Sequence, residues 1–287
     1  MKKTILFAIL LYIATLSAFA AAPSDMRFHC DKDTLRINEL LTKGAESGIS
    51  GANELMAFYA KQLLGTPYVA HTLDGDREWL TIDIDELDCT TFVETLYSLT
   101  RSTLDMRRSW RDYARNLESI RYRDGQLGDY SSRLHYISDW IANNSHRGNI
   151  REATAEIDGA KYDIKTINFM TANRDKYPQL SDSAMFAKIK NFEIGYRMHR
   201  YPYLKKEWID SKKTKAGLKN GDIVALLTKV DGLDVSHMGV LIKDGEKLWL
   251  LHASSKDKKV VLEKDDLKET LRRNRSWTGV RVIRIIE

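Results

Sequence analysis

Three residues have types and positions that suit nucleophilic catalysis: Cys89, His237 and His252. Cys89 directly follows Asp88, a preferred N-cap residue, at the start of an apolar pattern with helical spacing. Backbone N–H groups and the helix dipole at such a position favour the thiolate, the reactive form of a cysteine. The position alone fits a small buried side chain at a helix start equally well, so a partner base must be identified.

The two histidines lie in segments that flank Asp244-Gly245, a strong signal for a β-hairpin turn. If these two residues form the loop, the register places His237 directly opposite His252 on one face of the hairpin. Residues opposed in this way lie roughly 5 Å apart at Cβ. One imidazole can then act as a general base while the other orients it through a ring hydrogen bond. The alternative is that two half-buried histidines share a sheet face by coincidence.

The first 20 residues have the features of a signal peptide. Two lysines precede an apolar stretch at residues 5–16, and Ala18 and Ala20 are the small residues that a signal peptidase recognises. The stretch is too short to span a membrane comfortably, and no later segment is longer. We therefore expect export to the periplasm or cell envelope, cleavage near Ala20, and no stable membrane insertion of the mature chain. That compartment permits disulfides, so Cys30 and Cys89 can be joined in one structural disulfide. The alternative is that Cys89 is a reactive thiol and Cys30 has no part in the chemistry.

Helical patterns come first along the chain and alternating patterns come last. Helices are predicted at residues 31–42 and 53–64, from residue 88 onward, and near 264–274. Strands are predicted at residues 222–228, 236–243, 247–254 and 280–286. This order predicts an α+β fold with an antiparallel sheet, as a single domain over residues 21–287. Residues 101–208 are interpreted as a large, mostly helical insertion, with helices at 110–119, 136–143 and 181–190.

The composition excludes several classes of protein. The chain is 43% hydrophobic and 30% charged, which is typical of a chain that buries a core rather than a disordered one. The net charge of +5 is small, and no long basic run indicates nucleic-acid binding. Phosphate-binding glycine loops, dinucleotide fingerprints and zinc motifs are absent from the sequence, so we expect no cofactor and no metal.

The chemistry-bearing segments resemble those of a known superfamily. Residues 88–94, Asp-Cys-Thr-Thr-Phe-Val-Glu, resemble the nucleophile motif of the NlpC-type, papain-like cysteine peptidases that cut bacterial cell wall. Residues 221–224, 236–240 and 251–254 resemble the strands that carry the base and the third polar residue, and 64–68 resemble the segment upstream of the nucleophile. The resemblance implies a papain-like core in which Cys89 attacks, His237 is the base and His252 orients it. It also places Tyr68 and Asp88 at the border of the active site, with Tyr68 and the helix-start N–H groups stabilising the oxyanion.

The insertion narrows the resemblance to one branch. Residues 122–125 and 132–140 resemble the N-acetylmuramoyl-L-alanine amidase-like family of exported envelope proteins. This implies cleavage of the amide between N-acetylmuramic acid and L-alanine, with peptidoglycan fragments as partners. The absence of an additional wall-targeting domain favours soluble fragments over intact wall. The alternative for the polar residues of this segment is a packed helix with a charged surface. The candidate substrate-binding residues are Arg123, Asp124, Ser132, Arg133, His135, Tyr136 and Ser236.

Three other interpretations remain open at this point. The same machinery could cut the γ-D-glutamyl bond of the stem peptide. A zinc amidase could use His237 and His252 as ligands, but it lacks an identifiable third ligand and leaves Cys89 unexplained. A wall-binding module with a degenerate site is disfavoured by the intact set of one cysteine and two histidines. The sequence does not indicate an oligomeric state.

Overall fold

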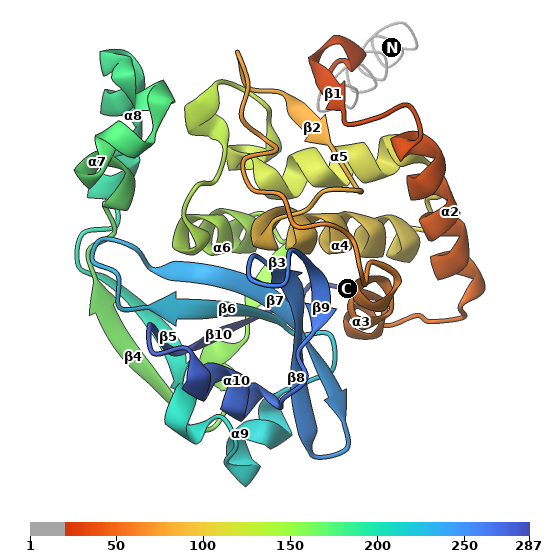
Figure 1. The fold of residues 1–287 in the computed structure, drawn as a ribbon, viewed down its shortest axis with the longest axis vertical. Coiled ribbons are helices and arrows are strands. Elements are labelled where there is room, and N and C mark those ends of the chain that lie inside the picture. Colours follow the sequence, from red (N-terminus) through yellow and green to blue (C-terminus); the bar gives the residue numbers. More distant parts are fainter. Residues whose placement is uncertain (1–20) are drawn as a thin grey trace, which may run out of the picture.

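The computed structural model describes residues 21–287, and the predicted signal peptide lies outside the described residues. An antiparallel sheet lies between a large layer of helices and a smaller helical cover (Figure 1). The helices are α2 (Asp33–Glu46), α3 (Ala52–Gln62), α4 (Cys89–Leu104), α5 (Trp110–Arg121), α6 (Ile137–His146), α7 (Phe169–Ala172), α8 (Ser183–Ile194), α9 (Lys212–Gly217) and α10 (Leu267–Arg273). Within residues 21–287, no helix is long and apolar enough to span a membrane.

The main sheet contains eight strands in the order β4-β5-β10-β6-β7-β8-β9, with β3 also paired to β10. Its strands are β3 (Ile150–Glu152), β4 (Ala160–Lys165), β5 (His199–Lys205), β6 (Ile223–Thr228), β7 (Val235–Asp244), β8 (Lys247–Ser254), β9 (Lys259–Leu262) and β10 (Trp277–Ile285). A separate parallel pair joins β1 (Met26–Phe28) to β2 (Leu80–Ile82). This arrangement confirms the predicted α+β class.

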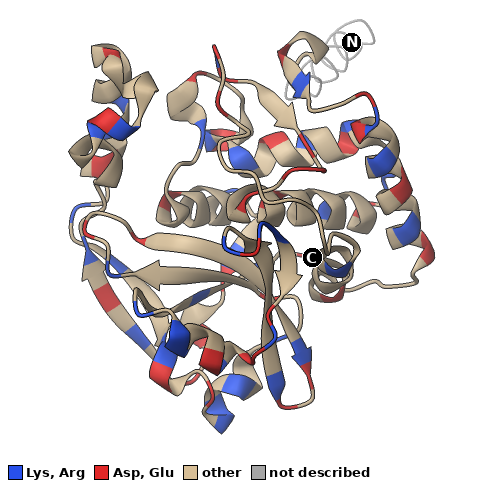
Figure 2. Cartoon of the chain, viewed as in Figure 1, with Lys and Arg blue, Asp and Glu red and all other residues tan. Residues whose placement is uncertain are grey.

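Both faces of the sheet are buried, so its central strands have nearly continuous apolar sequences. On one face, Phe92 and Leu96 of α4 belong to the same core cluster as Met238 of β7. On the other face, Leu271 of α10 belongs to a second cluster with Leu226 of β6. Figure 2 accordingly shows α4 and the central strands mostly without charged residues, while acidic and basic residues alternate at the periphery. Packing in these two clusters fixes the position of α4 relative to the β7–β8 hairpin.

A capping box begins α4 where the sequence predicts it. The Asp88 carboxylate accepts hydrogen bonds from the backbone N–H groups of Thr90, at 2.9 Å, and Thr91, at 2.8 Å. In return, the Thr91 hydroxyl accepts the Asp88 backbone N–H at 2.8 Å. Such a cap stabilises a helix by about 1 kcal/mol. It also makes Cys89 the first residue of the helix.

The segment at residues 101–208 is less helical than predicted. Its helices α5, α6 and α8 lie near the expected positions, but β3, β4 and β5 also belong to it and join the main sheet. Both β3 and β5 pair with β10 at the other end of the chain. These strands are short and acquire their partners only in the tertiary structure, so their sequence periodicity is weak. The segment is therefore partly integrated into the sheet.

The register predicted for the hairpin is wrong. Asp244 pairs with Lys247, so the loop consists of Gly245 and Glu246 rather than Asp244 and Gly245. Gly245 has a φ of +55°, and a glycine at the first loop position is what a type II′ turn requires. The observed pairing differs from the predicted pairing by two residues, so each side chain stays on the face of the hairpin that the sequence predicts. Continuing it from the Val240–Leu251 pair places His252 across from Gly239, not from His237.

Candidate active site

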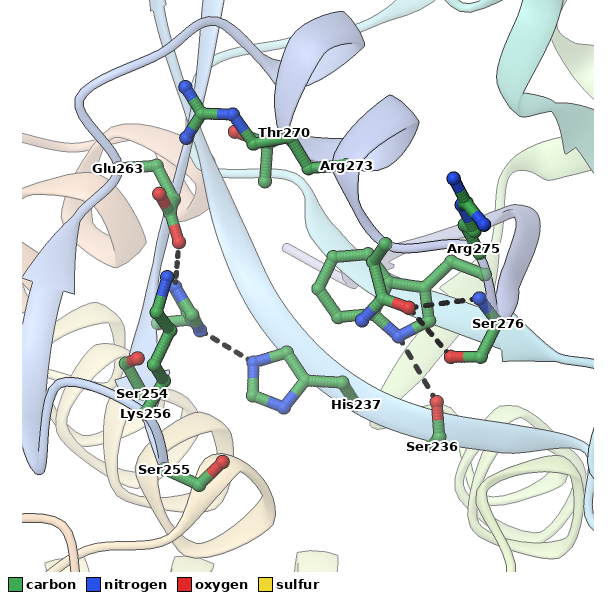
Figure 3. Close-up of a pocket in the computed structure, with 13 residues that line it drawn as sticks. Ser236, His237, Ser254, Ser255, Lys256, Glu263, Thr270, Arg273, Arg275 and Ser276 are labelled. Atoms are coloured by element: carbon green, nitrogen blue, oxygen red, sulfur yellow. Dashed lines mark hydrogen bonds and ion pairs between the residues drawn. The ribbon is translucent and has the colours of Figure 1, made fainter.

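Three side chains from β7, β8 and the residue after β9 form a hydrogen-bonded chain (Figure 3). His237 Nε2 and His252 Nδ1 are 2.6 Å apart, and the two rings meet edge to face with centroids 4.7 Å apart. On its other side, His252 Nε2 lies 3.1 Å from Glu263 Oε1. His252 is buried, with only 4% of its surface exposed. A buried imidazole with both nitrogens engaged is held in one orientation.

Gly239 makes room for this arrangement. A Cβ atom at Gly239 would lie 2.9 Å from His252 Cβ and 2.8 Å from the Leu251 carbonyl oxygen, which real Cβ atoms do not tolerate. Because the position across from His252 has no side chain, the His237 ring can reach it diagonally from the same face. The β6–β7 pairing is irregular beside His237, where the register shifts after Leu226. Such irregularities re-aim side chains next to functional sites.

The surroundings of His237 keep its ring neutral. Burial lowers the pKa of His237 to about 3, and the adjacent His252 contributes to this reduction. The Trp277 ring stacks on His237 with centroids 5.8 Å apart and an interplanar angle of 16°. Trp277 is itself held by a hydrogen bond from its Nε1 to Ser236 Oγ at 3.2 Å. At neutral pH, His237 therefore has one nitrogen without a proton and can accept one.

Cys89 lies against the strand that carries His237. The backbone N–H of Met238 faces the thiol, and Thr90 Oγ1 lies 4.0 Å from Sγ. Within residues 21–287, no hydrogen bond joins Cys89 to His237. The structure thus places the thiol against the backbone of the residue that follows His237.

The electrostatics of Cys89 differ from the sequence-based expectation of a favoured thiolate. Burial raises the pKa of the Cys89 thiol to about 12, and the negative charge of Asp88 adds to the effect. The main physical reason is the burial of the sulfur, and the cap adds to it. The Asp88 carboxylate occupies the N–H groups of Thr90 and Thr91 that were expected to face the sulfur. The resting thiol is therefore protonated.

Tyr68 lies within electrostatic range of Cys89 and Asp88. Burial raises the pKa of Tyr68 to about 12, and the charges of Cys89 and Asp88 contribute to this increase. The Tyr68 backbone N–H donates to the Lys258 carbonyl at 2.9 Å, which ties this segment to the turn before β9. Its phenol remains protonated at neutral pH and can donate a hydrogen bond next to Cys89.

A cavity of about 660 Å³ opens beside the histidines. Glu263 is the single carboxylate that lines it, and that group is bound to His252. Lys256 and Arg275 also line it and make no ion pair within the described part of the chain. The other lining residues are mostly polar: Ser236, Ser254, Ser255, Thr270, Arg273, Asn274, Ser276 and Trp277. The cavity is therefore suited to a polar ligand with negative charge.

Most of the predicted substrate-binding residues of the 101–208 segment have structural partners. The Arg123 guanidinium pairs with Asp139 and covers the Phe192 ring at 3.7 Å. The Tyr136 hydroxyl donates to Glu193 at 2.7 Å and accepts the backbone N–H of Met170. The donor and one acceptor of this hydroxyl are therefore engaged in packing contacts, and the substrate contact of Tyr136 stays a prediction.

Three further predicted substrate-binding residues make local hydrogen bonds. His135 bonds the Tyr130 carbonyl through Nε2 at 2.8 Å, and burial lowers the pKa of His135 to about 3. The space that His135 shares with Arg123 and Tyr136 is only about 10 Å³, too small for a ligand. Asp124 exchanges hydrogen bonds with Asn143, and the Ser132 hydroxyl closes a local turn by donating to the Asp129 carbonyl at 2.7 Å.

Arg133 alone of these residues lines a second sizeable cavity, of about 420 Å³. Its guanidinium lies 3.3 Å from Glu78 and over the Tyr130 ring, with 5.0 Å between the guanidinium carbon and the ring centroid. Tyr130 lines the same cavity. This cavity is therefore lined by both an aromatic ring and a cation.

The sequence reasoning missed Glu263 and Trp277. Glu263 was missed because β9 was not recognised, although Val260 and Val261 follow a polar turn and have high strand propensity. Trp277 begins β10 and reaches His237 only through the sheet order. The disulfide alternative is not found, because Cys30 and Cys89 are both free thiols.

Comparisons with known proteins agree with the resemblance to the N-acetylmuramoyl-L-alanine amidase-like family. Residues 59–280 match the AmiA-like family model, described as N-acetylmuramoyl-L-alanine amidase-like. The solved structure of an N-acetylmuramoyl-L-alanine amidase from Bacteroides uniformis is 39% identical, with a TM-score of 0.77, over 82% of this chain and 99% of that chain. A Bacteroides fragilis protein that carries the provisional name xylanase is 40% identical, with a TM-score of 0.73, over 79% of this chain and 99% of its own. A Legionella pneumophila protein shares the fold at 19% identity, with a TM-score of 0.67, over 88% of this chain and 95% of its own. No curated protein matches the sequence.

Proposed function

Because the chain belongs to the AmiA-like, N-acetylmuramoyl-L-alanine amidase-like family, we propose that it is an exported cysteine amidase of peptidoglycan fragments. The bond is the amide between the lactyl group of N-acetylmuramic acid and L-alanine. The main structural support is the hydrogen-bonded chain from His237 through His252 to Glu263, together with the position of Cys89 against the backbone of the residue that follows His237. We assign the α+β core to the papain-like, NlpC-type architecture on the same grounds.

The hydrogen-bonded chain determines which nitrogen acts as the base. The Glu263 carboxylate only accepts hydrogen bonds, so His252 must donate to it from Nε2. In the proposed resting enzyme His252 carries one proton, so it accepts at Nδ1 and His237 donates to it from Nε2. This tautomer leaves Nδ1 of His237 without a proton. His237 Nδ1 is therefore the general base in the proposed reaction.

The reaction begins with a neutral thiol. With pKa values of about 12 for Cys89 and about 3 for His237, proton transfer in the resting enzyme is unfavourable. The thiol proton therefore moves to His237 as Sγ attacks the carbonyl carbon. His237 then protonates the leaving amine of L-alanine as the C–N bond breaks, leaving a thioester. Water, deprotonated by His237, hydrolyses the thioester, releases the sugar acid and restores the thiol.

Two donors can stabilise the oxyanion. The backbone N–H groups of Thr90 and Thr91 are bound to Asp88, which leaves the N–H of Cys89 itself. The Tyr68 hydroxyl is the second donor, because its phenol stays protonated beside the thiol. Removing one such donor typically reduces kcat by about 10²- to 10³-fold.

The two cavities suit the two parts of a muramyl peptide. Lys256 and Arg275 can pair with the carboxylates of the stem peptide in the 660 Å³ cavity. Tyr130 and Arg133 of the 420 Å³ cavity can bind the sugar side. Soluble fragments are preferred in this proposal over intact wall.

Mass spectrometry of defined fragments tests the proposal. N-Acetylmuramoyl-L-Ala-γ-D-Glu-diamino acid should yield N-acetylmuramic acid and a peptide that begins with L-alanine. The free peptide L-Ala-γ-D-Glu-diamino acid and xylan should both be untouched, and a Cys89→Ala variant should be inactive on all three. Cleavage after D-glutamate, with the muramyl amide intact, would instead identify a γ-D-glutamyl endopeptidase.

The proposed export is tested separately from the proposed reaction. The protein purified from the periplasm of its host should begin after Ala20 by N-terminal sequencing. A chain that keeps Met1 and remains in the cytoplasm would contradict export without affecting the chemistry.

A further inference from the structure

A second group of chemically reactive residues lies at the ends of β1 and β2. These strands pair in parallel, with Phe28 opposite Ile82, so the residues that follow them meet at one edge. Residues 29–33 lead from β1 into α2, and residues 83–87 lead from β2 to the cap of α4. The loop that ends at Asp88 and Cys89 is thereby placed against the N-terminal segment.

Two sets of potential metal ligands occupy this edge. The Cys30 thiol and the carboxylates of Asp33 and Asp85 have ligand atoms within 4.8 Å of one another. Adjacent to them, His29, Asp83 and Glu86 form a second set within the same limit. No sequence motif marks either set, because each draws its members from two distant segments.

Asp33 is the member whose environment is incomplete. Its side chain is 0% exposed, and its Oδ1 atom has no hydrogen-bond partner. Its Oδ2 atom accepts only the backbone N–H of Cys30, at 2.8 Å. Burying a carboxylate oxygen without a partner is costly, so such an atom indicates a missing cation or donor.

The cations present do not supply that partner. The Arg36 guanidinium contacts Asp85 Oδ1, which leaves Asp85 Oδ2 facing the Cys30 thiol at 3.9 Å. His29 Nδ1 lies 3.5 Å from Asp83, within the adjacent set. The buried oxygen of Asp33 is therefore unmatched while a thiol and a second carboxylate oxygen lie next to it.

We propose that Cys30, Asp33 and Asp85 bind a divalent cation of the zinc class. Zinc takes thiolate sulfur at about 2.3 Å and carboxylate oxygen at about 2.0–2.2 Å, with four ligands in a tetrahedron. The ion draws the three side chains together, releases the Cys30 proton and leaves a fourth position for water. It joins the N-terminal segment to the loop before Cys89 and takes no part in the proposed amidase reaction.

Metal binding by the mature protein tests this site. After treatment with EDTA and its removal, the protein should bind one equivalent of Zn²⁺ or Co²⁺ in equilibrium dialysis with elemental analysis. The Co²⁺ form should show a sulfur-to-metal charge-transfer absorption. Cys30→Ser should abolish that absorption, whereas the matched thiol variant Cys89→Ser should keep it.

Two aspartate variants test whether the Asp33 carboxylate is a metal ligand. Asp33→Asn should weaken Zn²⁺ binding by roughly tenfold or more, and Asp31→Asn, at an exposed neighbouring position, should not change it. Circular dichroism of each metal-free variant separates a lost ligand from a lost fold. A wild-type protein that binds no Zn²⁺ overturns the proposal. So does a Co²⁺ absorption that survives in Cys30→Ser or disappears in Cys89→Ser.

Discussion

His237 and His252 share a 2.6 Å hydrogen bond although neither lies directly opposite the other in the hairpin that carries both. The pairing is diagonal, and Gly239 provides the space for it. Glu263 holds the far side of His252, so the tautomer proposed for both histidines rests on one carboxylate. The proposed base, His237 Nδ1, therefore depends on a residue that does not contact the thiol.

Replacing the thiol should eliminate turnover while the fold is retained. Cys89→Ala and Cys89→Ser should both be inactive on muramyl peptides, since the nucleophile is lost and serine is a poor substitute without a stronger base. Thermal unfolding should show a transition close to that of the wild type. A zinc amidase that uses His237 and His252 as ligands would keep its activity in both variants.

The reactivity of Cys89 should rise steeply with pH. Alkylation requires the thiolate, and burial with the Asp88 charge raises the pKa of Cys89 to about 12. In a Cys30→Ser background, the iodoacetamide rate should therefore increase about tenfold per pH unit between pH 6 and 9. A rate that is flat over this range would reveal a preformed thiolate–imidazolium pair and contradict the neutral resting state.

The three members of the hydrogen-bonded chain should differ in their contributions. His237→Ala should remove nearly all activity, and His252→Ala should leave roughly 1–10%, because an orienting residue contributes less than the base. Glu263→Ala should reduce kcat by roughly three- to tenfold. Nitrogen-15 NMR of the imidazoles should show that Glu263→Ala loses the Nε2–H tautomer of His252. Equal losses for His237→Ala and Glu263→Ala would argue against this order of roles.

Gly239 should tolerate no side chain. Gly239→Ala places a methyl group 2.9 Å from His252 Cβ, which displaces that ring and should lower kcat/KM by about 10- to 100-fold. Gly245→Ala is the matched control in the same hairpin. No atom lies within 4 Å of its added Cβ, so it should cost stability through its positive φ but leave turnover unchanged. Wild-type kinetics in Gly239→Ala would show that the histidine pair does not need this space.

Cys30 should be dispensable for turnover. Both cysteines are free, and a bridge to Cys89 would consume the nucleophile. Cys30→Ser should therefore keep its kcat on muramyl peptides at moderate temperature. Recovery of a peptide joining Cys30 to Cys89 from fully active, non-reduced protein would contradict the proposed role of Cys89.

Sequence alone determined the features that depend on neighbours along the chain. The cap at Asp88, the start of α4 at Cys89 and the alternating strands around both histidines follow from local hydrogen bonding and periodicity. The α+β class follows from the order of those elements. Even with the wrong register, both histidines were assigned to one face, because a shift of two residues preserves the alternation of side chains.

Only the tertiary structure decided the features that depend on distant partners. Glu263 reaches His252 through the β8–β9 pairing, and Trp277 reaches His237 because β10 lies next to β6. The pKa of Cys89 also depends on residues that are distant in the sequence. The helix start favours a thiolate, but packing against β7 removes solvent from the sulfur, and desolvation outweighs the helix dipole there. Burial and cross-strand position are properties of the assembled sheet, and a local pattern of residues does not contain them.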